Sequence, residues 1–307
     1  MTDTLKKFLF EDASVRGELV ELSESWQQVL ARRSYPPAVQ AVLGQMMAAA
    51  ALLSANLKFN GALIMQIHGD GPVSLLVVEC DAQLRMRATA KLVADSVIDD
   101  DASFIELVNQ QGNGRFAITL DPKDKLPGQQ AYQGIVPLDG ATVAASIEHY
   151  MQRSEQLDTR LWLAADGEVA RGLLLQKLPS QGGISHSGRD HDEPTWDRVA
   201  ILAATLQETE LLGTGIQTLM QRLFWQETLH EFDPLHPQFH CSCDRKRVGN
   251  MLKMLGRDEV EAALEELGQL HIDCDFCGQH YQFDKIDCAQ LFAGDASAEP
   301  PEGGSTH

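Results

Sequence analysis

The chain has 307 residues and is acidic, with 44 Asp and Glu against 25 Lys and Arg and a formal net charge of −19. Its length suits one large domain with a smaller module, and its 44% hydrophobic content is enough for a normal core. Such an acidic surface repels phosphate backbones and anionic lipid, so we expect neither nucleic-acid nor membrane binding. No segment approaches the roughly 20 apolar residues of a membrane span, and the apolar run near the N-terminus is too short for a signal peptide. We therefore expect a cytoplasmic protein.

The first 178 residues mix helical and strand-like stretches, with strands in the majority. Pro36-Pro37 opens a run rich in alanine and methionine, which predicts a buried helix over 37–56. A second helix is predicted over 141–156. Alternating apolar residues predict strands at 15–22, 62–68, 73–80, 84–88, 114–120, 130–136, 159–164 and 169–176. Because the strands occur in runs, the predicted fold class is α+β rather than a doubly wound sheet.

The composition becomes polar and turn-rich after Leu178, so we place an N-terminal α+β core domain at 1–184. The next segment, 185–239, is called the linker here. Its pattern predicts one helix over 196–212 with Gly213 as the C-cap, and a capping box at Thr214 predicts a second helix to about 228. The linker is more apolar than a free connector. Its apolar residues are Val199, Ala200, Leu202, Ala203, Leu206, Leu211, Leu212, Ile216, Leu219, Met220, Leu223, Phe224 and Trp225.

Four of the six cysteines form two close pairs, Cys241-Ser-Cys243 and Cys274-Asp-Phe-Cys277. Thiolates are the ligands that Zn²⁺ prefers in a closed structural site. In a reducing compartment, paired cysteines indicate metal binding or redox chemistry rather than structural disulfides. We therefore predict that Cys241, Cys243, Cys274 and Cys277 bind one Zn²⁺ ion.

The cysteine pairs belong to a small module predicted at 240–292. Two helical patterns, 247–255 and 258–267, can bring the two pairs together, and a strand is predicted at 281–283. A module of this size is near the limit at which a core alone is sufficient, so a metal commonly completes the fold. The tail at 293–307 is predicted to be disordered.

The remaining cysteines and the nearby histidines are not expected to be ligands. Cys80 lies in an apolar strand and is expected to be a small buried hydrophobic residue. Cys288 could be an alternative ligand or disulfide partner, but four thiolates already complete a tetrahedron. For the same reason, we interpret the histidines near the cysteines as bystanders. These are His236, His240, His271 and His280.

The spacing of the cysteines leaves the purpose of the metal open. The site could be purely structural, or it could be a redox switch, because disulfides cannot hold zinc and metal binding supplies folding free energy in such modules. A dithiol oxidoreductase is a third reading of the Cys-x-x-Cys pair, but the expected βαβ setting is missing. The linker has two readings as well. Its apolar face could simply pack on the core, or that packing could last only while the zinc module supports it.

The chain resembles the bacterial redox-regulated 33-kilodalton heat-shock chaperone family, an ATP-independent holdase. The resemblance is carried by 239–247 around the first cysteine pair, by 272–278 around the second, and by Tyr281-Gln282-Phe283. The segments 8–15 and 197–212 are also similar, and the likeness covers nearly the whole chain apart from the tail.

The resemblance implies a mechanism. The reduced protein would bind zinc through the four thiolates and be inactive. Peroxide or hypochlorite, with heat or another unfolding stress, would join Cys241 to Cys243 and Cys274 to Cys277. Zinc would leave, the linker would unfold, and the exposed surface would hold unfolding client proteins. Activated members of the family can form homodimers.

Two other classes of function compete with the holdase. One is a zinc-braced binding or regulatory module with a fixed protein partner and no redox switching. The other is an enzyme, but the chain has no G-x-S-x-G motif, no glycine-rich phosphate loop and no His-Glu-x-x-His helix. We therefore expect a protein that is not an enzyme.

Overall fold

The structure is a computed structural model that describes residues 2–11, 14–125, 130–178 and 192–293. The chain forms two compact units, Met1–His240 and Cys241–His307. The start of the predicted linker and the predicted tail beyond residue 293 lie outside the described residues.

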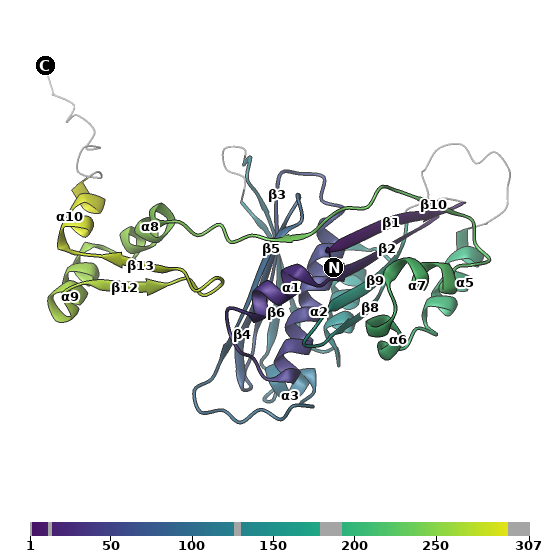
Figure 1. The fold of residues 1–307 in the computed structure, drawn as a ribbon, viewed down its shortest axis with the longest axis horizontal. Helices are drawn as coiled ribbons and strands as arrows, with labels where there is room; N and C mark the ends of the chain where they lie inside the picture. Colours follow the sequence, from purple (N-terminus) through teal and green to yellow (C-terminus); the bar gives the residue numbers. More distant parts are fainter. Residues whose placement is uncertain (1, 12–13, 126–129, 179–191, 294–307) are drawn as a thin grey trace, which may run out of the picture. The chain divides into compact units, whose positions relative to one another are not determined.

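The first unit contains two sheets (Figure 1). The five-stranded sheet has the order β10-β1-β2-β9-β8, and every pairing in it is antiparallel. Its strands are β1 (Thr4–Phe10), β2 (Val15–Leu22), β8 (Thr159–Ala165), β9 (Ala170–Lys177) and β10 (Leu229–Glu231). The α+β class predicted from the sequence is confirmed, as are the predicted strands at 15–22, 159–164 and 169–176 to within two residues.

The six-stranded sheet has the order β11-β5-β4-β3-β6-β7. Its strands are β3 (Gly61–His68), β4 (Val73–Asp81), β5 (Arg85–Leu92), β6 (Arg115–Pro122), β7 (Tyr132–Pro137) and β11 (Gln238–Phe239). The predicted hairpin of β3 and β4 is present, with Met65 opposite Val78. Only the pairing of β11 with β5 is parallel among the described strands of this sheet.

Helix α2 (Pro37–Ser54) contacts strands of both sheets and forms the centre of the main core. Its alanines, including Ala48 and Ala51, are fully buried, because a small side chain lets the helix lie close to the strands. The expectation that no segment approaches a membrane span is wrong for α2, which is long and apolar enough by length and composition. However, 72% of this helix is buried inside the unit, as in a core helix. The predicted helix at 141–156 is α4 (Val143–Tyr150) continued by a π-helix at Met151–Glu155. Two short helices, α1 (Glu24–Leu30) and α3 (Phe104–Val108), complete this part.

Three helices of the linker pack on the other face of the five-stranded sheet (Figure 1). They are α5 (Asp192–Ala203), α6 (Glu208–Gly213) and α7 (Ile216–Leu223). This face of the sheet, called the outer face here, consists of Phe8, Phe10, Val15, Leu19, Ala164, Leu173 and Leu175. The outer face and the linker form a second buried cluster, separate from the cluster around α2.

The linker helices differ from the sequence prediction in two places. The single helix predicted at 196–212 is wrong, because the chain turns between α5 and α6, and this break lets Leu206 and Leu211 enter the same buried cluster. The capping box at Thr214 is also wrong, since Gly215 is the N-cap and the carbonyl of Thr214 accepts a hydrogen bond from Arg171. α7 ends at Leu223 rather than near 228. Phe224 leaves the helical conformation and packs between the Phe8 and Phe10 rings, with ring centroids 5.7 and 5.2 Å apart.

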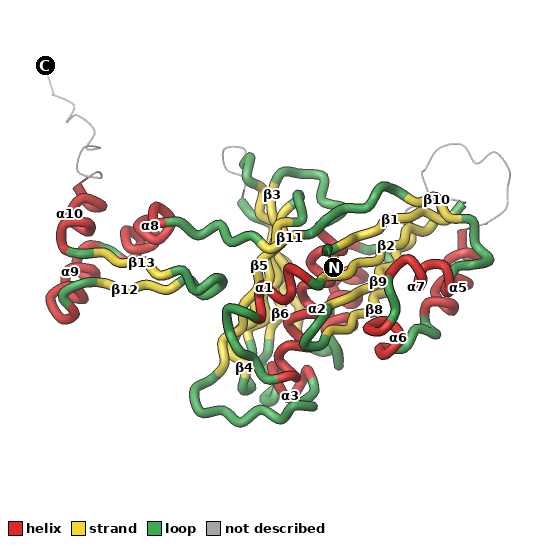
Figure 2. The backbone as a smooth tube through the Cα atoms, viewed as in Figure 1, coloured by secondary structure: helices red, strands yellow, loops and turns green. Residues whose placement is uncertain are grey.

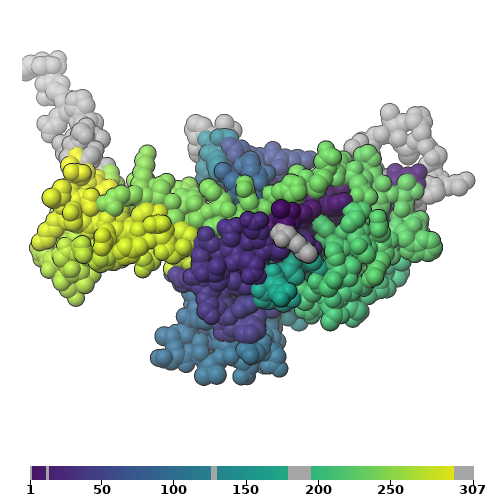
Figure 3. Space-filling model, in the orientation of Figure 1, coloured from purple at the N-terminus to yellow at the C-terminus, as the bar shows by residue number. Residues whose placement is uncertain are grey.

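The end of the linker adds a strand to the edge of each sheet. β10 pairs with β1, so that Leu9 lies opposite His230, and Leu5 and Leu235 exchange two backbone hydrogen bonds of 2.8 Å. β11 pairs with β5, and the amide of His240 donates to the carbonyl of Met86 at 2.8 Å. In Figure 3 the green surface of the linker lies over and beside the purple surface of the N-terminal strands. The sequence did not predict either edge strand.

The second unit, called the module here, is small. In Figure 2 the helices of this unit flank its hairpin. The elements are α8 (Arg245–Leu255), α9 (Arg257–Leu267), β12 (Leu270–Asp273), β13 (His280–Phe283) and α10 (Lys285–Ala293). Its buried hydrophobic cluster has only six described members: Leu252, Val260, Leu264, Leu270, Phe283 and Cys288. So small a core gives little free energy of folding on its own, which favours an additional cross-link.

Candidate metal centre

The four predicted cysteines converge in the module. The Sγ atoms of Cys241, Cys243, Cys274 and Cys277 all lie within 4.8 Å of one another. Cys241 Sγ is 3.7 Å from Cys274 Sγ, and Cys243 Sγ is 3.3 Å from Cys277 Sγ. Within the described part of the chain, this is the one group of three or more cysteine, histidine or carboxylate side chains that could together hold a metal ion.

The first cysteine pair lies between β11 and α8. Asp244 is the N-cap of α8, and its carboxylate accepts a 2.7 Å hydrogen bond from the amide of Arg247. The guanidinium of Arg247 in turn donates to the hydroxyl of Ser242 at 2.5 Å. Capping and this side-chain contact therefore hold the Cys-Ser-Cys segment against the start of the helix.

The second pair forms the turn of the β12–β13 hairpin. The amide of Gly278 donates to the carbonyl of Cys274 at 2.8 Å, and Gly278 has a φ of +71°, which favours glycine. The turn therefore points both thiols to the same side. On the following strand, the hydroxyl of Tyr281 donates to Cys243 Sγ at 3.1 Å. A hydrogen bond from β13 thus reaches the first cysteine pair.

The thiols of the second pair resist ionisation in the absence of a cation. Burial raises the pKa of the Cys277 thiol to about 12 and also raises the pKa of Cys274. The hydrogen bond to Cys243 raises the pKa of the Tyr281 hydroxyl. Several thiolates this close would repel one another, so a divalent cation is the natural way to keep them deprotonated.

The geometry fits a tetrahedral site. Zn–S bonds of about 2.3 Å would place the sulfurs of a tetrahedron about 3.8 Å apart, close to the 3.7 Å between Cys241 and Cys274 and not far from the 3.3 Å between Cys243 and Cys277. None of the six cysteines forms a disulfide in the structure. The four cysteines could therefore hold one metal ion, and their all-sulfur composition suits zinc.

The other cysteines and histidines lie outside this group. Cys80 is completely buried in β4, and burial raises the pKa of its thiol to about 12, as expected for an inert core thiol. Cys288 belongs to the hydrophobic cluster of the module. His236 contacts the carbonyl of Asp3 at 3.0 Å, while His271 and His280 contact each other.

Comparison with known proteins identifies the family of this chain. The family model described as Hsp33 protein matches residues 3–284. The chain belongs to the Hsp33 family. A 33 kDa chaperonin of Methylobacillus flagellatus is 46% identical over 293 residues, covering 95% of each protein. A 33 kDa chaperonin of Chromobacterium violaceum is 47% identical over 300 residues, covering 98% of this chain and 97% of the relative.

A solved structure has the same fold. The crystal structure of the 33 kDa chaperonin of Thermotoga maritima, a heat shock protein 33 homologue, superimposes with a TM-score of 0.76. It covers 95% of this chain and 99% of its own length at 18% sequence identity. The Hsp33 resemblance drawn from the sequence is thereby confirmed.

In this Hsp33 protein a buried arginine fixes the linker to the outer face. Arg171 of β9 is 7% exposed, and its Nη2 atom lies 2.6 Å from Glu21 Oε2 on β2. Its Nη1 atom donates to the carbonyls of Leu211, Leu212 and Thr214 at 3.0, 2.6 and 2.9 Å. These carbonyls lie at the C-terminal end of α6, where a cation is favourable for the helix dipole. Sequence reasoning missed Arg171, because only the fold brings it to the linker.

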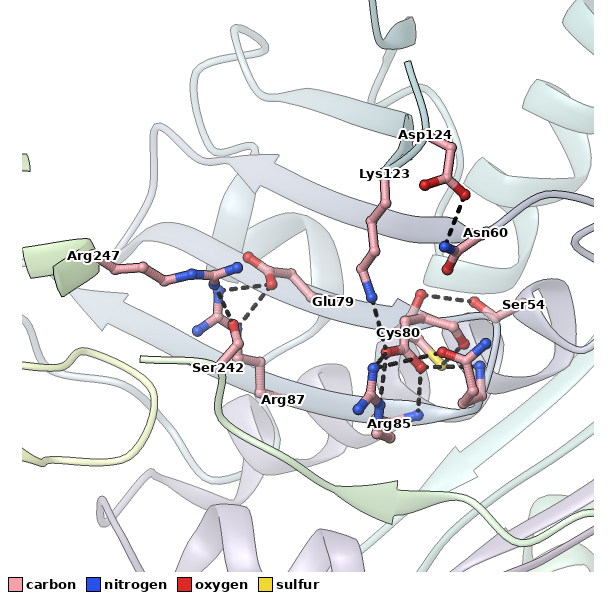
Figure 4. A network of polar contacts seen from close by, with 12 residues as sticks. Ser54, Asn60, Glu79, Cys80, Arg85, Arg87, Lys123, Asp124, Ser242 and Arg247 are labelled. Carbon is pink, nitrogen blue, oxygen red and sulfur yellow. Dashed lines mark hydrogen bonds and ion pairs between the residues drawn. The ribbon is translucent and has the colours of Figure 1, made fainter. Parts of the chain in front are cut away.

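A second polar network organises the turn that receives β11 (Figure 4). Asp81 at the end of β4 accepts hydrogen bonds from the amides of Gln83 and Arg85, each at 3.0 Å. The Arg85 guanidinium lies 2.7 Å from the same carboxylate, and Lys123 Nζ lies 3.7 Å away. The carbonyl of Leu84 in this turn accepts the amide of Gln238 at 3.0 Å. Asp81 thus holds the β4–β5 turn in the conformation in which the carbonyl of Leu84 binds the linker residue Gln238.

Proposed function

We propose that this chain is a redox-regulated, ATP-independent chaperone that holds unfolding proteins and prevents their aggregation during oxidative stress. The observation that carries the proposal is the course of the linker. It covers an apolar face and two strand edges of the first unit, and it is followed directly by Cys241. Membership of the Hsp33 family and the name chaperonin on its relatives support this proposal.

In the reduced state, Cys241, Cys243, Cys274 and Cys277 would hold one zinc ion. The ion would supply a fourfold cross-link to a module whose own core has six described members. Cys241 directly follows His240, whose amide makes the last hydrogen bond of the linker with the carbonyl of Met86. A folded module would therefore restrain the chain at the point where the linker ends. The linker helices stay on the outer face, and the protein is inactive.

Oxidation removes the ligands. Two thiols lose two electrons and two protons to one hydrogen peroxide, which becomes two water molecules, and one disulfide forms. The proposed disulfides are Cys241–Cys243 and Cys274–Cys277. Each requires two sulfurs that now lie within 4.8 Å to approach to about 2.05 Å, and a disulfide sulfur no longer binds zinc. The module then loses its cross-link and unfolds.

Release of the linker would expose what it covers. The outer face carries four aromatic or aliphatic side chains on β1 and β2 that are almost completely buried at present, namely Phe8, Phe10, Val15 and Leu19. The edges of β1 and β5 would lose their partners as well, and an unpaired edge accepts extended chains. A large apolar patch beside open edges suits unfolding proteins of many sequences.

The acidic composition fits this role in the cytoplasm. A formal net charge of −19 would keep a complex with an aggregation-prone client soluble. The exposed edges and outer face would also permit two activated chains to form a homodimer. Binding of clients needs no bond-breaking step, so we propose no enzymatic activity.

The test combines zinc release with suppression of aggregation. Reduced and peroxide-treated chain are each mixed with a heat-unfolding test protein, while light scattering and zinc release are followed together. The proposal predicts that only the oxidised chain releases zinc and suppresses scattering. Equal binding of a partner by both forms would instead support the zinc-braced module with a fixed partner. Retention of zinc with no suppression after oxidation rejects the switch.

A further inference from the structure

The β12–β13 hairpin has two chemically different faces. Strand pairing places His271 opposite Gln282 and Asp273 opposite His280. Since side chains alternate along a strand, these four polar residues share one face of the hairpin. The other face carries Leu270, Ile272, Tyr281 and Phe283, which belong to or pack on the hydrophobic cluster of the module. The polar face therefore points away from the hydrophobic cluster of the module.

Two imidazole rings meet on the polar face. His271 Nδ1 lies 3.1 Å from His280 Nε2, and the rings are stacked with centroids 5.2 Å apart. Two nitrogens bound at about 2.1 Å to adjacent positions of one octahedral ion lie about 3.0 Å apart. The two nitrogens thus already have the separation that a shared cation requires.

Asp273 prepares His280 as a ligand. His280 Nδ1 lies 2.7 Å from Asp273 Oδ1, so Nδ1–H donates to the carboxylate. That tautomer leaves the lone pair on Nε2, the atom that faces His271. A carboxylate on the far nitrogen of a ligating histidine orients the ring and increases its basicity in many metal sites.

The side-chain amide of Gln282 lies beside the same nitrogen of His271 and could turn an oxygen donor toward it. Its amide nitrogen lies 3.3 Å from His271 Nδ1. Rotation of the amide by half a turn would place its oxygen at that position instead. His280 and Asp273 are 48% and 65% exposed, so water can occupy the remaining coordination positions.

We infer that His271 and His280 form a second metal site on the module, separate from the four cysteines, with Asp273 as the residue that positions His280. Imidazole nitrogens select borderline divalent cations, so the site takes Ni²⁺, Cu²⁺ or Zn²⁺ rather than Mg²⁺ or Ca²⁺. In the metal-free hairpin, His271 Nδ1–H donates to His280. On binding, His271 moves that proton to Nε2, and both facing nitrogens coordinate the ion. This inference does not depend on the holdase activity.

The test uses Ni²⁺ with the untagged, reduced, full-length chain. The chain is saturated with Zn²⁺, freed of excess metal and assayed for zinc, and then titrated with Ni²⁺ by calorimetry. We expect one Ni²⁺ per chain with no loss of zinc and no nickel–thiolate absorption. His271→Ala and His280→Ala should each weaken binding more than tenfold, and Asp273→Asn should weaken it about tenfold.

His149→Ala is the matched control. His149 also contacts a carboxylate, with Nδ1 3.1 Å from Asp139 Oδ1, and it is similarly exposed at 49%. It has no second imidazole among its described contacts, so its loss should leave the affinity for Ni²⁺ unchanged. If His271→Ala and His280→Ala keep their zinc and bind Ni²⁺ as the unmodified chain does, the inference is wrong. If either variant loses zinc, His271→Asn and His280→Gln replace it in the same titration.

Discussion

The two faces of the five-stranded sheet are both buried, but they are covered in different ways. The inner face packs on α2, a core helix that also contacts the six-stranded sheet. The outer face packs on short linker helices joined by turns. The inner cluster has more than twice as many buried residues and includes strands of both sheets, whereas the outer cluster joins strands of one sheet to the linker alone. A single strand therefore has one apolar face against the core helix and one against the linker, and the proposed switch would uncover only the second.

The largest effect is expected from removing the metal ligands. Cys277→Ser should abolish tight zinc binding, and the module should lose most of the roughly 10–16 kcal/mol that a structural zinc site supplies. Hydrogen exchange should then be fast throughout 241–293, while α2 stays protected. Cys80→Ala is the control, because Cys80 is buried in the first unit and should leave the zinc content unchanged. A module that stays protected without metal would contradict the proposed cross-link.

The next largest effect is expected at the buried arginine. Arg171→Ala leaves Glu21 as an unpaired buried charge and three carbonyls of the linker without their donor. Removing one partner of a buried ion pair typically costs about 3–5 kcal/mol. Amides of α6 and α7 should exchange faster, and less peroxide should be needed for activation.

An exposed ion pair in the linker provides the control for that variant. Arg222 lies 3.3 Å from Glu210, with the two side chains 60% and 34% exposed. Such pairs contribute about 0–1 kcal/mol, so Arg222→Ala should change exchange and activation little. Equal effects of the two variants would show that burial of Arg171 is not what matters.

Substitutions of two adjacent leucines on β9 compare the two faces of the sheet directly. Leu173 belongs to the outer cluster and Leu174 to the inner one, and both are fully buried. Each change to alanine should cost about 2–5 kcal/mol. Leu173→Ala should loosen the linker and lower the oxidant threshold, whereas Leu174→Ala should lower the melting temperature of the whole first unit. Chaperone assays and thermal unfolding of both variants check this, and identical behaviour would contradict the distinction between the faces.

The smallest effect is expected from a buried carboxyl on the inner face. Burial raises the pKa of Glu18, outweighing the hydrogen bond from Asn56 and the attraction of Arg16 and Lys7. The raised pKa means that an ionised Glu18 destabilises the folded state, and that this cost grows as the pH rises above the ordinary value of 4.5. Glu18→Gln should therefore raise the melting temperature near neutral pH, and the difference should shrink as the pH falls toward 4.5. A difference that does not change with pH would show that Glu18 is not the titrating group.

The sequence predicted what depends on local chemistry. The two cysteine pairs could be identified as ligands from their spacing alone, and the structure brings Cys241, Cys243, Cys274 and Cys277 together as predicted. Most of the apolar residues named in the linker pack as expected, Leu219 and Met220 among them, but Trp225 is 75% exposed and does not.

What the sequence did not predict depends on contacts between distant residues. β10 and β11 are short, and only their pairing with β1 and β5 makes them strands. The chain breaks between α5 and α6 because Leu206 packs into a cluster of side chains from several strands. In the sequence Arg171 looks like an ordinary strand residue. Only the folded structure brings it into contact with Glu21 and with the C-terminal end of α6.

Hydrogen exchange of the oxidised chain tests the central claim most directly. The claim is that covering of the outer face depends on the four cysteines. After peroxide treatment, amides of the linker from 195 to 240 should lose their protection together with those of the module, while amides of α2 and β3 keep theirs. Aggregation suppression should rise in step with the loss of linker protection. A linker that stays protected in a chain that suppresses aggregation would contradict the account.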